Sequence, residues 1–478
     1  MEFAVNTKDL VLESLLSQIG ISRADSGGPI EIVGNDPVVP SRHRPGLASA
    51  AALAAQAAAI GTIWKMRTGR GQEISVDLLQ AAIPGLRTVR YLVQNDHSLD
   101  FFGPQTTAPN FFATRDDRRI YLLRFPTYPK HLRRLLELLG CTNDSTEAMS
   151  NAVRGWNAVE LEDALAERRL VGAVSRQREE WLAHPQGRWL AERPVIHIEK
   201  LGDSPPEPFL PASRPLSGVR VLDMTHVLAG PTCSRVLAEQ GADVLHVEPP
   251  NQPDGLTNAL DTGLGKRSAY IDLDRPDDVQ VAQALAREAD IFVQSWRPGS
   301  LDGRGFSPEQ LARQRPGIIY VSVSCYGSGG PWRTRGGYDP VGQTVCGLAM
   351  DEGSPDRPQM APTFTLNDYL AAYLASAGAL GALVRRAREG GSYHVQISLT
   401  RCSMWLQELG RLPVEQWPDR SNGMPPLPTP RPSDLMSIPS AFGTLQHAAP
   451  IARYSETKAF WALPPAPAGS SRAEWLPR

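Results

Sequence analysis

The pattern of apolar and polar positions changes several times along the chain. Residues Gly46–Trp64 form an alanine-rich run that is apolar on nearly every side. Alanine has the highest helix propensity, and a helix without a polar face must be surrounded by protein, so the run predicts a buried helix. Gly69 and Gly71 then supply a helix end and a turn. The alternation over Glu73–Leu78 predicts a strand after them.

A second pattern predicts a small α+β domain over residues 111–201. Arg119–Leu123 has the character of a strand, and Tyr128–Leu139 is a basic amphipathic helix that Gly140 closes. Residues 202–213 are polar and rich in proline, which is typical of a linker. We therefore place a domain boundary there, and we treat residues 1–110 as a separate first region.

The most regular pattern lies between residues 214 and 410. Apolar strand-like segments alternate with amphipathic helices, and this alternation predicts an α/β domain built on a doubly wound, parallel, Rossmann-like sheet. The expected strands are Val219–Asp223, Gly241–Glu248, Ser268–Asp272, Asp290–Gln294 and Gly317–Val323. The expected helices are Ala229–Glu239, Pro276–Glu288, Ser307–Gln314 and, after a glycine-rich loop over Gly327–Gly337, a long helix from about Asp368 to Arg386. Residues 411–478 are rich in proline and show little periodicity, so we expect them to wrap over the surface.

One internal repeat connects the first region with the third. Aligning Gly69 with Gly390, an offset of 321 positions, superposes the alanine-rich helix, the glycine turn and the alternating strand on their later counterparts. Under this offset Ile74, Val76 and Leu78 fall on Val395, Ile397 and Leu399. Duplication explains the match, although two alanine-rich helices also resemble each other by composition alone. At the position of Asp368 the first copy has Leu47.

Composition narrows the class of protein. With 478 residues the chain is long for one hydrophobic core, which favours two or more domains. A net charge of −2 and the lack of long basic runs argue against a nucleic-acid binder. No stretch holds the roughly 20 uninterrupted apolar residues that span a bilayer, and the first residues do not resemble a signal peptide. Five scattered cysteines fit reduced thiols, so we expect a cytoplasmic protein without membrane association.

Several kinds of site are not indicated. The nine histidines form no HxxxH or HExxH pair, so no metal site is predicted. The sequence has no GxxxxGK[ST] phosphate loop, and Ala229–Pro231 does not match GxGxxG. Glu248 ends the second expected strand, where a dinucleotide-binding fold contacts ribose, but one carboxylate suits the ribose of another nucleotide or a capping role equally well.

An ordered set of motifs over residues 214–410 resembles the family III CoA-transferases (CaiB/BaiF, formyl-CoA transferase-like). The motifs lie at Pro215–Thr225, Ala229–Pro231, Leu237–Val244, Val247–Pro249, Gly265–Ser268, Ile271–Leu273, Arg297–Leu301, Tyr326–Gly327, Gly330–Pro331 and Tyr338–Gln343. Arg67–Gln72 with Ser75–Asp77 resembles the stretch that follows the family's long helix, and the segment after it resembles the family's small domain. Here that domain comes before the Rossmann-like part instead of after it. The chain therefore resembles two incomplete copies in tandem.

The resemblance implies a site and a reaction. The family's catalytic aspartate, at the start of the long helix, corresponds to Asp368. CoA would move from an acyl-CoA thioester to a free carboxylic acid through an aspartyl mixed anhydride and an aspartyl-CoA thioester. Coenzyme A is then a substrate, and no permanently bound cofactor is expected. Family members form interlocked homodimers, so a homodimer is expected here.

Physical chemistry fits these roles. The helix dipole and backbone N–H groups at the helix start are expected to keep Asp368 ionised, and a simple capping role is the alternative. The diphosphate and the 3′-phosphate of CoA need cations and backbone donors. The positions that the resemblance implies for CoA binding are His226, Ala229, Gly230, Lys266, Arg267, Trp296 and Arg297. From composition alone, each basic residue could equally be a solvated surface charge.

Two competing functions remain open at this point. The family also contains α-methylacyl-CoA racemases, which need a second acid/base. Their histidine is replaced here by Tyr338, a phenol whose ordinary pKa of about 10 makes it a poor base. A non-catalytic acyl-CoA binder is the other alternative, because the domain order is changed, Leu47 replaces the aspartate of the first copy, and the family's tetraglycine flap has no clear counterpart beyond the lone Gly423.

Overall fold

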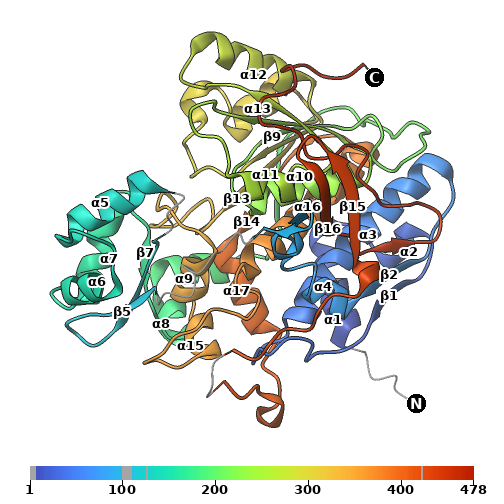
Figure 1. Cartoon of the computed structure of the whole chain (residues 1–478). Coiled ribbons are helices and arrows are strands. Elements are labelled where there is room, and N and C mark those ends of the chain that lie inside the picture. The colour runs from blue at the N-terminus through green and yellow to red at the C-terminus, as the bar shows by residue number, and fades with distance from the viewer. Residues whose placement is uncertain (1–6, 100–109, 125–127, 421–423, 478) are drawn as a thin grey trace.

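The computed structural model describes residues 7–99, 110–124, 128–420 and 424–477 (Figure 1). Gly423, the lone glycine discussed above in connection with the tetraglycine flap, lies outside these residues. The chain is a mixed α/β protein with one seven-stranded, mostly parallel sheet and three smaller sheets. The predicted α/β class is confirmed.

The large sheet has the strand order β11-β10-β9-β12-β13-β14-β8. The strands are β8 (His197–Gly202), β9 (Arg220–Met224), β10 (Asp243–Glu248), β11 (Lys266–Tyr270), β12 (Ile291–Gln294), β13 (Ile319–Ser324) and β14 (Ser392–Ser398). Strands β9 to β14 are parallel, and β8, which the sequence did not predict, is an antiparallel edge strand. The chain order reverses between β9 and β12, the place where open parallel sheets bind ligands.

The two faces of this sheet belong to separate hydrophobic cores, because successive side chains of a strand point to opposite faces. On one face Val221 and Val293 pack with α10 (Ala229–Glu239) and α16 (Leu366–Glu389). On the other face Leu222 and Phe292 pack against α12 (Pro276–Glu288) and α13 (Pro308–Gln314) (Figure 1). Helices α10 and α12 have the predicted ends, and Pro276 in the first turn of α12 is a strong signal for a helix start.

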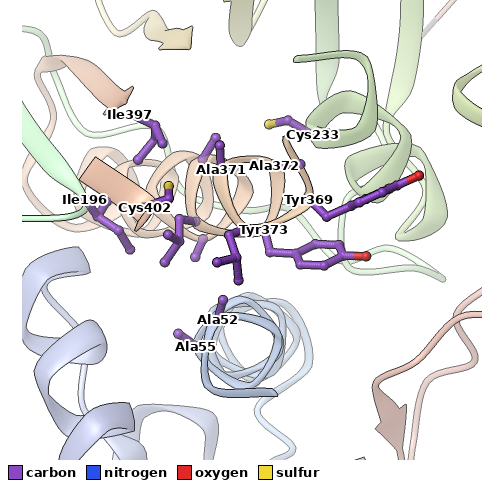
Figure 2. Packing of buried hydrophobic residues seen from close by; sticks show 14 of the residues in the cluster. Ala52, Ala55, Ile196, Cys233, Tyr369, Ala371, Ala372, Tyr373, Ile397 and Cys402 are labelled. Carbon is purple, nitrogen blue, oxygen red and sulfur yellow. The ribbon is translucent and has the colours of Figure 1, made fainter. Parts of the chain in front are cut away.

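The alanine-rich run forms α3 (Pro45–Thr68), which is buried from Pro45 to Trp64, as predicted. By length and composition this helix could span a membrane, the single such helix among the described residues, but its apolar part is enclosed by protein. Helix α3 and helix α16 have 24 residues each, and their first residues, Pro45 and Leu366, differ by the 321 positions of the sequence repeat. Figure 2 shows Ala52 and Ala55 of α3 next to α16, whose Ala371 and Ala372 face towards Cys233 of α10. Small side chains let the helix backbones approach closely.

The first region has its own small sheet next to α3. Strand β1 (Ile30–Val33) pairs parallel with β2 (Ile74–Asp77), and α3 connects them. In the same way α16 connects the parallel strands β13 and β14. The remaining helices of the first and third regions are α1 (Thr7–Ile19), α2 (Arg23–Ser26), α4 (Leu78–Ala82), α11 (Leu256–Thr262), α14 (Asp339–Val345), α15 (Leu348–Glu352) and α17 (Leu399–Glu408).

The small α+β unit forms the blue-green lobe of Figure 1. Its antiparallel sheet contains β5 (Phe111–Ala113), β6 (Arg119–Leu122) and β7 (Gly172–Val174). Its helices are α5 (Pro129–Leu139), α6 (Thr146–Val153), α7 (Ala158–Glu167), α8 (Arg178–Ala183) and α9 (Pro185–Ala191). Gly140 caps α5 in the left-handed conformation, as its position in the sequence predicts.

The expectation that residues 411–478 only wrap over the surface is wrong for part of this region. Strands β15 (Leu435–Ser440) and β16 (Gly443–Ala448) form a hairpin that pairs with β3 (Val93–Gln94) and β4 (His97–Ser98). Strand β17 (Arg453–Tyr454) adds to β2. Proline is compatible with this arrangement, because Pro439 lies on β15, an edge strand.

Candidate active site

The predicted site residues that follow β9 and β12 lie together where the strand order reverses. His226 comes directly after β9, and Trp296 and Arg297 come directly after β12. The imidazole of His226 stacks on the indole of Trp296, with ring centroids 4.3 Å apart. Ser295 joins the two segments, because its Oγ accepts the His226 N–H at 3.1 Å. The stacked pair of His226 and Trp296 is called the aromatic platform here. Trp296 Nε1 donates to the carbonyl of Met224, which fixes this aromatic platform to the sheet.

The backbone beside the platform is strained. Val227 has φ of 71°, which is unfavourable for a β-branched residue. This conformation aims the Val227 N–H at the carboxylate of Asp254, with N–O distances of 3.0 and 3.1 Å. Asp254 therefore lies at the site, although no sequence pattern indicated it.

Ala229 and Gly230 begin α10, as predicted, and both are buried. A Cβ atom on Gly230 would lie 2.6 Å from the side chain of Thr225. The absence of a side chain at Gly230 thus lets α10 pack directly on the segment after β9.

Lys266 is placed differently from the expectation that it faces a phosphate. Only 3% of the residue is exposed. Its Nζ donates to Asp223 Oδ2 at 2.8 Å, to the carbonyl of Pro231 at 2.6 Å and to Ser234 Oγ at 2.9 Å. An ammonium group has three donor protons, so none is left for a ligand.

Arg267 points away from Lys266. Its guanidinium pairs with Asp243 at 3.0 Å and donates to the carbonyl of Glu474. Neighbouring residues of a strand point to opposite faces, so the two cations cannot both reach one phosphate once β11 includes both of them. The strand predicted from the sequence begins two residues later, at Ser268, so this restriction was not apparent from the sequence.

Arg297 is exposed, and among the described residues its guanidinium makes no hydrogen bond or ion pair. Its Nη1 lies about 4.0 Å from the position of a Cβ on Gly336, at the end of the glycine-rich loop. Burial raises the pKa of Tyr338, and the positive charge of Arg297 opposes this rise. Of the three predicted cations, Arg297 is the one whose donors remain available to an anion at the platform.

Asp368 lies half-buried in the first turn of α16. The helix N–H groups of Asn367 and Asp368 do not reach its carboxylate, because both donate to Asp339 Oδ2, the latter at 3.1 Å. Gln343 Nε2 donates to the same Asp339 side chain. Within the described residues, Asp368 accepts no hydrogen bond on its carboxylate.

This arrangement reverses the expected electrostatics of Asp368. Burial and the neighbouring Asp339 carboxylate raise its pKa well above the usual range. Burial also raises the pKa of Asp339, to about 7, although its three hydrogen bonds oppose the change. The expectation that the helix N–H groups keep Asp368 ionised is wrong, because Asp339 takes those donors. A carboxylate without donors is less stabilised as an anion and more basic.

The first region repeats this capping arrangement. Asp36 Oδ2 accepts the N–H of Leu47 at 2.8 Å, as Asp339 accepts the N–H of Asp368. The repeat offset aligns Leu47 with Asp368. The first copy therefore has a capping carboxylate of its own, although the offset does not align Asp36 with Asp339, and it has no carboxylate at the position of Asp368.

Tyr128 of the small α+β unit completes the surroundings of Asp368. Its ring lies 5.7 Å from that of Tyr338, measured between centroids. Burial and the charges of Asp254 and Asp368 raise the pKa of Tyr128, and burial raises that of Tyr338. The two partial copies of one chain therefore meet at this site.

The glycine-rich loop is also held by the small unit. A Cβ at Gly327 or Gly329 would lie 2.5 Å from the ring of Trp189 on α9. The buried Gln186 donates to the carbonyls of Tyr326 and Gly329 and accepts the N–H of Trp332. Glycine is required here because α9 packs against the loop backbone itself.

Sequence reasoning missed Asp339, Asp254 and Tyr128. For Asp339 a signal existed, since an acidic residue before Pro340 is typical of a helix start. The other two reach the site through tertiary packing, which no local pattern encodes.

Comparison with known proteins adds to this geometry. The model of "CoA-transferase family III" matches residues 20–205 and 216–418. An acetyl-coenzyme A transferase of Hypoxylon pulicicidum is 31% identical over 65% of this chain and 56% of its own length. A succinyl-CoA–D-citramalate CoA-transferase of Chloroflexus aurantiacus is 35% identical over 41% of this chain and 52% of its own length.

Solved structures match as well. A CAIB/BAIF family protein from Brucella suis is 29% identical, with a TM-score of 0.39, over 41% of this chain and 56% of that one. The chain spans about half the length of the curated relatives it matches. Because the family model covers most of the sequence, the chain belongs to CoA-transferase family III.

Proposed function

We propose that this protein moves CoA between an acyl-CoA thioester and a free carboxylic acid, with Asp368 as the nucleophile. The observation that supports this most directly is the carboxylate of Asp368, half-buried, free of hydrogen-bond donors and more basic than usual. Such a carboxylate is a better nucleophile than one in water. The charges of Arg297, Asp254 and Asp368 all act on Tyr338, which supports a position of Asp368 near the strand reversal of a Rossmann-like, doubly wound sheet, where ligands bind.

The steps follow from the chemistry of thioesters. An oxygen of Asp368 attacks the thioester carbonyl, the C–S bond breaks, and CoA leaves as a thiolate. The product is a mixed anhydride between the acyl group and Asp368. The thiolate then attacks the aspartyl carbonyl, which releases the first acid and forms an aspartyl-CoA thioester. The incoming carboxylate then attacks the aspartyl-CoA thioester and displaces the CoA thiolate, which gives a second mixed anhydride. The thiolate attacks the acyl carbonyl of this anhydride, which releases the new acyl-CoA and regenerates Asp368.

Other residues have supporting roles in this proposal. His226, Trp296 and Arg297 lie where the thioester and an anionic part of the substrate would bind. Ala229 and Gly230 shape the wall of the site. Lys266 and Arg267 hold the sheet together, so their predicted contact with CoA phosphate is not part of the proposal. Coenzyme A enters as a substrate, and a second protomer and a cytoplasmic location remain predictions.

The racemase alternative is less compatible with these groups. A racemase needs a second acid/base that titrates near neutral pH. Burial raises the pKa of Tyr338 further above its already high ordinary value, so this phenol does not accept a proton near neutrality.

The proposal predicts a trapped intermediate. We expect incubation with acetyl-CoA followed by hydroxylamine to convert Asp368 into a hydroxamate, because the aspartyl-CoA thioester is attacked by this nucleophile. Intact-protein mass spectrometry with peptide mapping measures the modification. Exchange of the α-proton of a 2-methylacyl-CoA in deuterated buffer, without any adduct, would instead indicate a racemase. CoA binding without either signal would indicate a non-catalytic binder.

A second prediction concerns pH. Asp368 must be ionised to attack, so activity falls below its pKa. In Asp339→Asn the neighbouring charge is lost, the pKa of Asp368 falls, and the acidic limb of kcat/KM moves to lower pH. The plateau should drop roughly three- to tenfold, because a less basic carboxylate is a weaker nucleophile. The phenols of Tyr128 and Tyr338 and the thiols of Cys325 and Cys402 also face this pair, but burial raises their pKa values, so none titrates on the acidic limb.

The pH profile separates this role of Asp339 from a structural one. A variant that only loosened α16 would lower the plateau and leave the midpoint of the acidic limb in place. An unchanged midpoint would therefore contradict the coupling between the two carboxyl groups.

A further inference from the structure

Two equivalent helices of the sequence repeat pack against each other inside this chain. Helices α3 and α16 align under the offset of 321 positions, and they lie side by side (Figure 2). In a twofold dimer the same surface of each copy contacts the other, so equivalent helices meet at the interface. Here both copies belong to one chain, and the interface is formed within one molecule.

This internal interface is enclosed by the chain itself. Helix α3 is buried from Pro45 to Trp64, and α16 is buried from Tyr369 to Val384. Segments of the first region cover α16, because the N–H of Val89 donates to Tyr369 Oη at 3.1 Å and Tyr373 Oη donates to the carbonyl of Gly85 at 2.5 Å. A second protomer could therefore reach neither helix without displacing part of this chain.

The small α+β unit of the first copy closes the glycine-rich loop of the second copy. Gln186 of α9 has no solvent exposure. Its Nε2 donates to the carbonyls of Tyr326 and Gly329, at 2.7 and 3.0 Å, and its Oε1 accepts the Trp332 N–H at 2.7 Å. The ring of Trp332 is buried beside His184 of the same unit, with ring centroids 4.5 Å apart. The loop is thus built to receive α9.

The same unit reaches the helices around Asp368. The N–H of Arg176 donates to the carbonyl of Thr344 on α14, the helix that carries Asp339. The indole of Trp181 donates to Met404 Sδ on α17 at 3.3 Å. In Figure 1, α8 and α9 lie next to α17. The small unit therefore belongs to the structure that holds the proposed nucleophile.

The chain connections support closure of the site by the unit of the same chain. Only residues 192–196 connect α9 to β8, and five residues span at most roughly 18 Å. Strand β8 pairs with β14 of the large sheet. The linker after β8 is anchored as well, because the N–H of Gly391 donates to the carbonyl of Ser204 and Glu207 pairs with Arg315 at 2.6 Å. An exchange of the unit between two chains would have to break these contacts.

We propose that one chain is a complete catalytic unit, in which the packing of α3 on α16 takes the place of a homodimer interface and the chain's own small α+β unit closes the site around Asp368. The homodimer that the family resemblance implies is then not required for the reaction. This inference rests on the proposed function, because it assigns the site of CoA transfer to a single chain.

An ion pair between the unit and the loop provides the place for a test. Arg335 of the loop and Asp163 of α7 are 2.7 Å apart, measured from Nη2 to Oδ1. In a double variant, Asp163→Cys with Arg335→Cys, a short bis-maleimide should join the two cysteines within one chain. Denaturing gel electrophoresis gives the mass of the product, and peptide mapping identifies the joined residues. The two single variants reveal any reaction of the native cysteines, such as the partly exposed Cys141.

The crosslinked protein also tests the catalytic part of the proposal. Size-exclusion chromatography with light scattering should give it the mass of one chain. Its CoA transfer from acetyl-CoA to a panel of carboxylic acids should stay within about threefold of the untreated double variant, because closure of the loop by its own unit is the working state. The single variants modified with N-ethylmaleimide are the control for the chemical change itself.

Each other outcome has a defined meaning. A covalent dimer as the main product, or no crosslink at all, would overturn closure within one chain. Activity that occurs only at the mass of two chains, or that falls more than about tenfold on crosslinking within one chain but not in the modified controls, would overturn the catalytic unit. If the crosslink forms within one chain while the wild-type protein transfers no CoA, the proposed function fails and the closure within one chain stands.

Discussion

Asp368→Asn should abolish CoA transfer while leaving the fold intact. The amide cannot attack a thioester, and removal of a covalent nucleophile lowers turnover by roughly 10³-fold or more. The hydroxylamine-sensitive adduct should disappear at the same time. Transfer of CoA from acetyl-CoA to a panel of carboxylic acids, followed by liquid chromatography of the acyl-CoA products, measures the effect.

Stability should change little in this variant. Asp368 accepts no hydrogen bond from the described residues, and its raised pKa shows that the surroundings disfavour the anion. Replacing it by a neutral amide of the same size therefore removes a cost rather than a contact. Asp356→Asn, an exposed change in the segment before α16, serves as the control and should keep full activity. Turnover of Asp368→Asn within tenfold of wild type would rule out Asp368 as the nucleophile.

Lys266→Met should have the largest effect on stability. The change takes the closest cation, at 2.8 Å, from the carboxylate of Asp223 in the core. Breaking a buried ion pair on one side costs about 3–5 kcal/mol. Asp223 has no solvent exposure, and the charges of Lys266 and His246 hold its pKa well below the usual range. Urea denaturation, followed by circular dichroism, gives the free energy of unfolding.

Two further variants test whether the unpaired carboxylate of Asp223 causes this loss of stability. Arg267→Met breaks a partly exposed ion pair with Asp243 and should cost no more than about 1 kcal/mol. A double variant, Lys266→Met with Asp223→Leu, should recover part of the loss because the buried carboxylate that lost its lysine is removed as well. If Lys266→Met instead keeps the free energy of unfolding and loses affinity for CoA, the lysine binds phosphate, as the sequence suggested.

Local signals predicted most of the large sheet and its helices. Helices α10 and α12 have the expected ends because proline and capping positions define them. Strand β11 begins two residues before the expected start, and this small shift decides the roles of Lys266 and Arg267, since it turns the two cations to opposite faces. The hairpin of β15 and β16 was missed because its strands pair with β3, a segment more than 300 positions away in the sequence.

The candidate site was less predictable from the sequence than the large sheet. The position of Asp368 followed from the family resemblance, and its place in the first turn of α16 agrees with that assignment. Its electrostatics could not be predicted, because the side chain that takes the helix donors, Asp339, lies on another helix. Chain geometry alone does not show which of two nearby carboxylates receives the shared N–H groups.

The close packing of α3 on α16 has a consequence for how this protein can change in evolution. The contact is made by alanines such as Ala52 and Ala55, and the facing helix carries Asp368 at its first turn (Figure 2). An added methylene on α3 has no empty space to occupy, so it must displace α16 along or away from its axis. The reach of the proposed nucleophile can therefore be adjusted by substitutions some 320 positions earlier in the sequence, which do not touch the proposed site. Under the proposed function, new acyl specificities would arise through α3 while every residue of the site itself stays fixed.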